Sequence, residues 1–140
     1  MLADYDPTNK EHIRLKEGIE VGNGLPTLVT PDKLVDALEK AGFEVIEHFD
    51  MLSGHLNEHE IPWYKTLMGD YSIKGFRMSR LGRFCTHVLV NVLEFFKIAP
   101  AGSVKVSKML NQTADDLVAA GRMSIFTPDY FFLARKPLQQ

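Results

Sequence analysis

Apolar residues recur with a helical period over residues 9–20, in a thin stripe that predicts a helix lying on a surface or covering another element. Thr8 and Glu11 have the spacing of a capping box, so Thr8 is the expected N-cap. Gly22-Asn23-Gly24 is expected to end the helix, because glycine and asparagine tolerate positive φ.

A second helix is expected to begin at Thr30-Pro31, with threonine as the N-cap and proline in the first turn. The following apolar residues share one face of this helix: Leu34, Val35, Leu38 and Ala41. Gly42 ends the helix, and residues 43–49 have the composition of a strand. A helix, a glycine and a strand in this order form the αβ unit of an α/β sheet.

The longest helical pattern covers residues 73–96. Its apolar residues share one face: Leu81, Phe84, Cys85, Val88, Leu89, Val92 and Phe95 or Phe96. Cys85 lies within this face, which favours a place in the core over a nucleophile. After Pro100 and Gly102, Ser103 is expected to cap a last helix that Gly121 ends.

The chain closes with a strand at about residues 129–135, at the end of an apolar segment that begins at Phe126. The simplest organisation is an α/β domain with two strands of one sheet and a mainly helical insertion between them. Residues 1–50 would form helix, helix and strand, residues 51–126 the insertion, residues 127–137 the last strand and residues 138–140 a tail. Specificity is expected to lie in the insertion.

The composition of the chain excludes several classes of function. The chain has 140 residues and a formal net charge of -2, which predicts a single domain and argues against a nucleic-acid binder. One cysteine excludes an internal disulfide and a cysteine-based metal site, and suits a reducing compartment. No signal peptide is expected, and no run approaches the roughly 18 apolar residues of a membrane span.

Several polar motifs are interpreted as structural and not as catalytic or ligand-binding. Gly22-Asn23-Gly24 follows a helix and lacks a third glycine, so it predicts a helix stop, or else a turn lining a pocket, and not a phosphate loop. His55 and His59 lie in a polar stretch that predicts a solvated loop and no metal site. Asp115 and Asp116 are interpreted as a solvated helix face. No catalytic, cofactor-binding or metal-binding residue is therefore assigned.

Arg77, Arg80 and Arg83 recur every three residues near the start of the long helix. Such a row could contact acidic lipid headgroups. More often the arginines of such a row pair with nearby carboxylates, and that interpretation is favoured.

The aromatic residues Trp63, Tyr64, Tyr71 and Phe76 crowd a segment without a clear period. Aromatic faces can bind a flat apolar ligand and can stabilise a cation. The alternative is that these rings only seal the insertion against the sheet, and the residues alone favour this alternative.

Several short blocks, in collinear order over nearly the whole chain, carry a family resemblance. They are residues 5–7 with 11–12, 18–26, 41–45, 61–64, 81–83, 93–95 with 99–103, 126–128 and 134–137. The blocks GNGLP, IPWY and FTP with FFLARKP are specific in combination. Together they resemble the C-terminal part of sterol 24-C-methyltransferases.

The resemblance implies the class I, Rossmann-like methyltransferase fold, a seven-stranded sheet with helices on both sides. Residues 1–5 would be the exit of its fifth strand, residues 43–49 the sixth, and residues 129–135 the seventh, antiparallel between its neighbours. The cofactor is S-adenosylmethionine, whose glycine-rich loop and acidic ribose-binding residue belong to the family's N-terminal half. That half is the expected missing partner, so this chain alone should be inactive and should fold poorly with open sheet edges.

The family methylates the sterol side chain at C24 in sterol biosynthesis, through a carbocation. The resemblance therefore implies an apolar sterol pocket lined by Trp63, Tyr64, Tyr71 and Phe76. Its rim would be formed by Gly22, Asn23, Gly24, Leu25 and Pro26. It also implies peripheral contact with the cytoplasmic face of the endoplasmic reticulum or with a lipid droplet, and it leaves a homo-oligomer open.

A second hypothesis is a shortened, non-catalytic paralogue that binds lipid or pairs with a full-length methyltransferase. A third is an unrelated α/β domain, which requires the collinear blocks to be coincidence. The coding sequence upstream of Met1 would discriminate the first two. The preferred sterol or other isoprenoid, and the number of methyl transfers, stay open.

Overall fold

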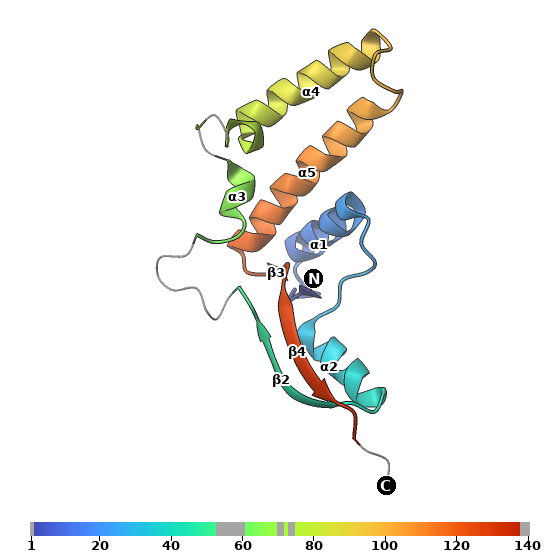
Figure 1. The fold of residues 1–140 in the computed structure, drawn as a ribbon, viewed down its shortest axis with the longest axis vertical. Coiled ribbons are helices and arrows are strands. Elements are labelled where there is room, and N and C mark those ends of the chain that lie inside the picture. Colours follow the sequence, from blue (N-terminus) through green and yellow to red (C-terminus); the bar gives the residue numbers. More distant parts are fainter. Residues whose placement is uncertain (1, 53–60, 70–71, 73–74, 138–140) are drawn as a thin grey trace.

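A computed structural model describes residues 2–52, 61–69, 72 and 75–137 of the chain. The fold is mixed α/β, with two small antiparallel sheets and a long helical hairpin (Figure 1). In chain order the elements are β1 (Leu2–Ala3), α1 (Lys10–Asn23), α2 (Pro31–Lys40), β2 (Glu44–Asp50), α3 (Lys65–Met68), η1 (Phe76–Met78), α4 (Arg80–Phe95), α5 (Ser103–Arg122), β3 (Phe126–Thr127) and β4 (Tyr130–Arg135).

Strands β2 and β4 pair antiparallel, from Glu44 opposite Arg135 to Asp50 opposite Tyr130, which confirms the predicted orientation of the two longer strands. Strand β1 pairs antiparallel with β3. Since β3 and β4 follow each other along the chain, residues 126–135 pair with β1 at their start and with β2 along the rest. Strands β1 and β3 have only two residues each, which is too short for an alternation of apolar and polar residues to be detected.

Helix α1 begins one residue later than predicted. Asn9, and not Thr8, is the N-cap, because its Oδ1 accepts a hydrogen bond from the Glu11 amide at 2.9 Å. Thr8 instead donates its hydroxyl to Asp6 Oδ1 at 2.7 Å. The predicted stop is confirmed at Gly24, whose φ of 62° is left-handed.

Helix α2 begins as predicted, with Thr30 at the N-cap and Pro31 in the first turn, although the Thr30 side chain makes no capping hydrogen bond. Gly42 has a φ of 86° and turns the chain into β2. Helix α2 packs against β2 (Figure 1). This helix, turn and strand confirm the predicted αβ unit.

The core lies between α1, the C-terminal half of α5, and the β1–β3 pair. Its buried apolar residues are Ala3, Leu15, Ile19, Leu28, Ala120, Ile125 and Phe126. The two helices approach closely because α1 presents glycines. Gly18 lies against Asp116 and Gly22 against Thr113, where a Cβ would overlap the facing side chain. Arg14 Nη1 also donates to Asp116 Oδ1 at 3.0 Å.

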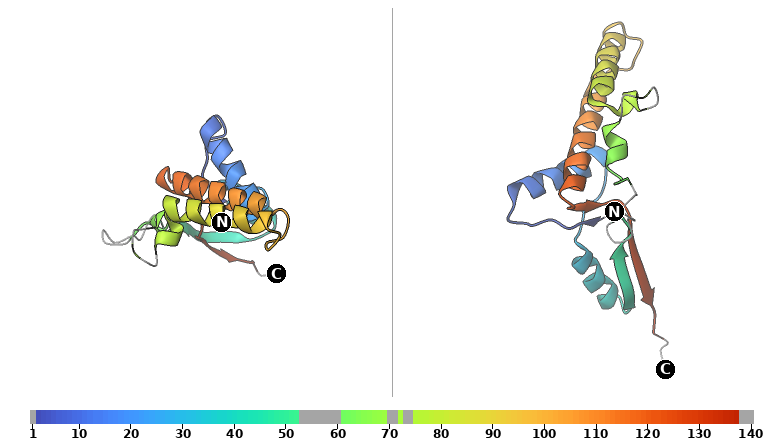
Figure 2. Two further views of the ribbon diagram at one scale, coloured as in Figure 1. Left: turned by 90° about the horizontal axis from the view of Figure 1, so that it is seen from above. Right: turned by 90° about the vertical axis from the view of Figure 1, so that its left-hand side faces the viewer.

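Helices α4 and α5 form a hairpin that projects away from the sheets (Figures 1 and 2). The predicted apolar face of α4 exists, but it is exposed. We call it the outer face of α4, and its residues are Leu81, Phe84, Cys85, Val88, Leu89, Val92, Phe95 and Phe96. The prediction that Cys85 lies in the core is therefore wrong.

Among the described residues no helix has both the length and the apolar composition needed to cross a bilayer.

Several polar contacts join α4 to α5. Arg83 Nη2 donates to Asp115 Oδ1 at 2.6 Å, and Arg83 Nη1 donates to the carbonyl of Asn111 at 3.1 Å. His87 Nδ1 lies 3.0 Å from Ser107 Oγ. We call these five residues the polar seam. They join the two helices through directional bonds.

The predicted helix over residues 73–96 is shorter than expected. Ser79 is extended and caps α4, since its Oγ accepts from the Gly82 amide at 3.1 Å. A Cβ at Gly82 would overlap the carbonyl of Phe76, so this close turn requires glycine. Residues 76–78 therefore form the separate 3-10 turn η1.

Both predicted ends of α5 are also wrong. The N-cap is Gly102, with a φ of 96°, while Ser103 already lies in the helix. The Glu94 carboxylate performs the capping, because it accepts from the amides of Gly102 at 2.9 Å and Val104 at 2.6 Å. At the other end Gly121 lies inside the helix, which continues to Arg122.

Acid should weaken the hairpin turn through Glu94. Hydrogen bonds from the Gly102 and Val104 amides hold the pKa of Glu94 below its ordinary value of 4.5. A carboxyl group with a lowered folded-state pKa contributes stability above its unfolded pKa, and that contribution is lost as the pH falls through the folded pKa. Stability measured by denaturation should therefore fall below pH 4.5 through this group.

The Glu94→Gln variant is the control for this prediction, because glutamine keeps an acceptor oxygen without a titrating charge. It should be less stable than the wild type at neutral pH, and the difference should shrink as the pH falls. The same difference at every pH would contradict the role assigned to the Glu94 carboxylate.

Candidate functional site

A cavity of about 620 Å³ opens where β1 and β2 end and β4 begins. Asp4 follows β1, Asp50 ends β2 and Tyr130 starts β4, and all three line the cavity. Trp63 and Tyr64 line it from the segment before α3. Ligands of α/β sheets commonly bind outside the carboxyl ends of the strands, so this position favours a binding site.

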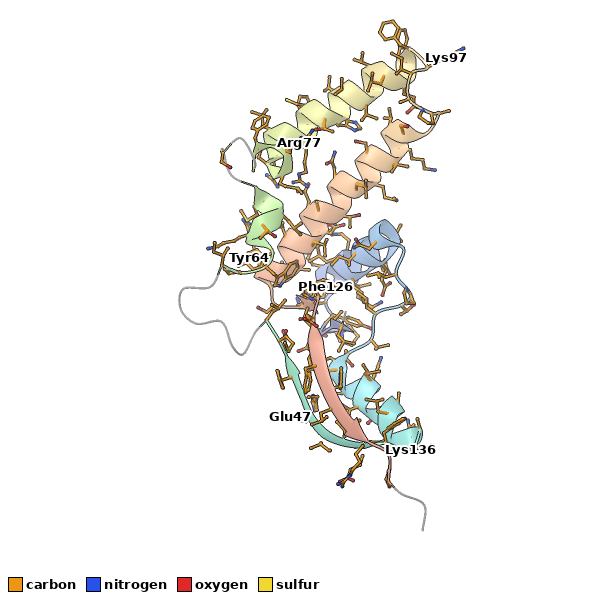
Figure 3. The ribbon with its side chains drawn as sticks, viewed as in Figure 1. Glu47, Tyr64, Arg77, Lys97, Phe126 and Lys136 are labelled. Carbon is orange, nitrogen blue, oxygen red and sulfur yellow. The ribbon has the colours of Figure 1, made fainter. Side chains whose placement is uncertain are left out.

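Trp63 belongs to the cavity wall and to the packing of the core at the same time. Its ring meets the buried Phe126 ring at a steep angle of 62°, with centroids 5.8 Å apart. Tyr64 meets Trp63 edge-on, with centroids 5.9 Å apart and an interplanar angle of 87°. Tyr64 and Phe126 both lie near the base of α5 (Figure 3). Because Phe126 is part of the core, it can fix the orientation of the Trp63 ring.

Tyr64 owes its position to a glycine. A Cβ at Gly121 would lie 2.6 Å from Tyr64 Cδ1, so the ring fits against α5 only because this residue has no side chain. The sequence pattern predicts a helix stop at Gly121. Its contact with Tyr64, which is distant in the sequence, gives it instead a packing role beside the cavity.

The opposite wall of the cavity is polar and well ordered by hydrogen bonds. Asp50 Oδ1 accepts from the Leu52 amide at 2.9 Å and lies 2.7 Å from the Thr127 hydroxyl. Tyr130 Oη lies 3.0 Å from His48 Nδ1. Burial, followed by the charges of Asp50 and two further aspartates, raises the pKa of Tyr130 above its ordinary value. Tyr130 therefore stays a neutral phenol at physiological pH.

The predicted site residues do not all meet at this cavity. Trp63 and Tyr64 line it together. Phe76 is partly exposed in η1, beside α4, and is not among the lining residues. Tyr71 lies outside the described residues, as do His55 and His59.

The predicted rim, residues 22–26, also lies elsewhere. Gly22 packs against Thr113 at the contact of α1 with α5. Asn23 Nδ2 donates to the carbonyl of Ile19, Gly24 caps α1, Leu25 packs on the core and Pro26 is exposed. These residues bend the chain from α1 toward α2, and none is among those lining the cavity.

The three arginines of the row differ in exposure, because Arg77 and Arg80 are exposed and Arg83 is half-buried. Arg83 pairs with Asp115, as the favoured interpretation predicts, and its side chain is only 14% exposed. The expectation of a solvated aspartate pair is wrong for Asp116, which is buried and bonded to Arg14. Within the described part of the chain, no group of three or more histidine, cysteine or acidic side chains could hold a metal ion.

Comparisons with known proteins agree with the family resemblance. A family model described as the C-terminal region of sterol methyltransferases matches residues 73–138. Cycloartenol-C-24-methyltransferase of Arabidopsis thaliana is 46% identical over 138 residues, which cover 98% of this chain and 40% of that protein. Sterol 24-C-methyltransferase of Kluyveromyces lactis is 41% identical over 148 residues, which cover 100% of this chain and 39% of that protein.

Sterol 24-C-methyltransferase of Saccharomyces cerevisiae is 39% identical over 145 residues, covering 98% of this chain and 37% of that protein. No solved structure matches the chain. The chain thus spans about 40% of the length of the Arabidopsis relative, and its match runs through nearly all of its own residues. Over nearly all of its residues the chain matches the C-terminal part of sterol methyltransferases.

Proposed function

We propose that this chain supplies the substrate pocket of an S-adenosylmethionine-dependent methyltransferase that modifies C24 of a sterol side chain. The observation that carries the proposal is the 46% identity to a cycloartenol-C-24-methyltransferase over 98% of the chain. The cavity beside β1, β2 and β4 supports it, because it combines aromatic rings with a position where α/β sheets bind ligands. The proposed place of action is the cytoplasmic face of the endoplasmic reticulum or a lipid droplet.

We extend the proposal to the fold of the complete enzyme. Strands β1 and β2 would be the fifth and sixth strands of a class I methyltransferase sheet, and residues 126–135 the seventh. The pairing of this segment with β1 and then with β2, antiparallel to both, supports the assignment. The remaining strands would come from the N-terminal half of the complete enzyme.

S-adenosylmethionine would supply a methyl cation equivalent from its sulfonium, and no residue of this chain is assigned to hold it. Transfer of this methyl group to the sterol double bond would leave a carbocation on the sterol, and loss of a proton would then give the neutral product. The faces of Trp63 and Tyr64 can stabilise this cation without forming a covalent bond. The Asp50–Thr127 and Tyr130–His48 contacts keep the polar wall in place.

A chimera tests the proposal directly. In it this chain replaces the matching C-terminal part of the Arabidopsis relative, and the product formed from cycloartenol and S-adenosylmethionine is identified by mass spectrometry. We expect a sterol that has gained a methyl group on its side chain. A folded chimera that binds S-adenosylmethionine but forms no such product would contradict the proposal and favour a non-catalytic lipid-binding or partner module.

Within this chimera, Trp63→Ala should lower kcat/KM for the sterol about 100-fold, since it removes a cavity wall and a cation-stabilising ring. The dissociation constant of S-adenosylmethionine should stay within about twofold of the parent value. The matched control is Ile61→Ala in the same block, where the exposed side chain should be dispensable. Unchanged sterol kinetics in Trp63→Ala would refute the role of this ring.

A further inference from the structure

Polar contacts join the two helices of the α4–α5 hairpin, while a row of apolar side chains along α4 is exposed. The polar seam joins the helices through Arg83, Asp115 and the His87–Ser107 contact. The outer face of α4 is exposed, and Leu81 is 55% exposed. A helix face with this many exposed apolar side chains marks a surface that contacts another apolar phase.

The apolar character is strongest at the far end of the hairpin. Phe95 and Ile98 are 81% and 73% exposed, the highest values among large apolar side chains in the described residues. Phe96 is 65% exposed and meets Phe95 edge-on, with centroids 5.3 Å apart. Lys97 lies at the turn, far from both sheets (Figure 3). We call these four consecutive residues the hairpin tip.

Positive charge surrounds the hairpin tip. Lys97, Lys105 and Lys108 are exposed, and none of them forms an ion pair with a described residue. Glu94 is the one acidic residue between positions 94 and 114, and its carboxylate is occupied by backbone amides of the turn. Three lysines and one glutamate leave this end of the hairpin with a formal charge of +2.

We propose that the hairpin tip inserts into the surface of a lipid bilayer that carries anionic headgroups. Phenylalanine and isoleucine side chains would enter the boundary between headgroups and acyl chains, while the three lysines bind lipid phosphates. The hairpin tip combines exposed apolar side chains with nearby lysines on one projecting turn. A second copy of this chain would satisfy the apolar side chains but would bring the lysines of both copies together.

This surface is distinct from the arginine row that the sequence indicates. Arg83 is held by Asp115 in the polar seam and cannot reach a headgroup without breaking that pair. The inference also rests on the hairpin alone and goes beyond the proposed methyl transfer. Vesicle binding is measured without turnover, so the failure of one proposal is distinguishable from the failure of the other.

The test is flotation of the full chain with vesicles of phosphatidylcholine alone and with vesicles that also contain phosphatidylserine. The wild-type chain should float with the anionic vesicles at low salt. Phe95→Ser combined with Phe96→Ser should reduce this binding about tenfold or more, because two apolar side chains no longer enter the bilayer. Val21→Ser, which changes an exposed apolar residue of α1, should leave binding unchanged.

The lysines are tested separately. Replacing Lys97, Lys105 and Lys108 with glutamine should weaken binding to anionic vesicles about fivefold per lysine. The same replacement at Lys10, Lys33 and Lys40 makes an identical change in net charge on α1 and α2, and should have a much smaller effect. Equal effects of the two triple variants would overturn the localisation to the hairpin tip.

A second measurement guards against misfolded variants. In Phe95→Trp the new indole should shift its emission to shorter wavelengths when anionic vesicles are added, whereas the wild type, with Trp63 alone, should not. Failure of the wild-type chain to float with anionic vesicles would overturn the proposal. Size-exclusion chromatography would then show what covers the hairpin tip instead. A dimer that Phe95→Ser with Phe96→Ser dissociates would indicate a second copy, and a monomer would indicate another part of a longer protein.

Discussion

Replacing Gly121 with alanine should lower the free energy of unfolding by about 1–3 kcal/mol. The new methyl group would lie 2.6 Å from Tyr64 Cδ1 and 2.8 Å from Tyr64 Cγ, well inside van der Waals contact. Tyr64 is a stiff ring packed edge-on against Trp63, so it can yield only by leaving its place in the cavity wall. Urea denaturation followed by circular dichroism measures the loss.

The control reverses the sign of the effect. In a Tyr64→Ala background the ring is gone, and the methyl group at position 121 no longer meets it. Alanine is favoured over glycine within a helix by about 1 kcal/mol, so Gly121→Ala should then be neutral or stabilising. If Gly121→Ala costs the same in both backgrounds, the Gly121–Tyr64 contact does not position this side of the cavity.

Replacing Leu15 with alanine should cost about 2–5 kcal/mol of stability, the largest loss expected from a single residue of α1. Leu15 is 0% exposed and packs between α1, α5 and the β1–β3 pair. The same substitution at Leu81, which is 55% exposed on the outer face of α4, should cost less than about 0.5 kcal/mol. Both variants are compared in one denaturation series.

The contrast between these two leucines tests where the core of the chain ends. Both belong to apolar helix faces that periodicity detects, although the stripe of α1 is the thinner of the two. Similar losses at the two positions would contradict the exposure of the outer face of α4 and would mean that it is buried in solution. Concentration dependence of the Leu81→Ala result would then identify self-association as the cause.

The sequence pattern predicted the four longer helices and the two longer strands, but not α3, η1 or what each apolar face touches. The outer face of α4 has the spacing of a core helix, and only the polar seam reveals that α4 turns its other side inward. Helix ends were predicted less well because neighbouring residues compete for the cap. Asn9 caps α1 in place of Thr8, and the carboxylate of Glu94, which is distant in the sequence, caps α5 in place of Ser103.

The candidate site was predicted in part. The only tryptophan in the chain drew attention to Trp63 and Tyr64, and both line the cavity. Asp50 and Tyr130 were missed because neither belongs to a motif. They meet through the pairing of β2 with β4, where Asp50 lies opposite Tyr130 across a long insertion. A pattern read along the chain contains no sign of such a contact.

The polar seam has a consequence for how this hairpin can change during evolution. Sliding α4 by one turn along α5 would separate Arg83 from Asp115 and His87 from Ser107 at the same time. Polar pairs between packed helices can fix the register of the two helices. Since the alignment is specified inside the hairpin, residues of the outer face can be replaced without changing the direction in which its turn projects. The hairpin can therefore acquire a new contact surface while it keeps its shape.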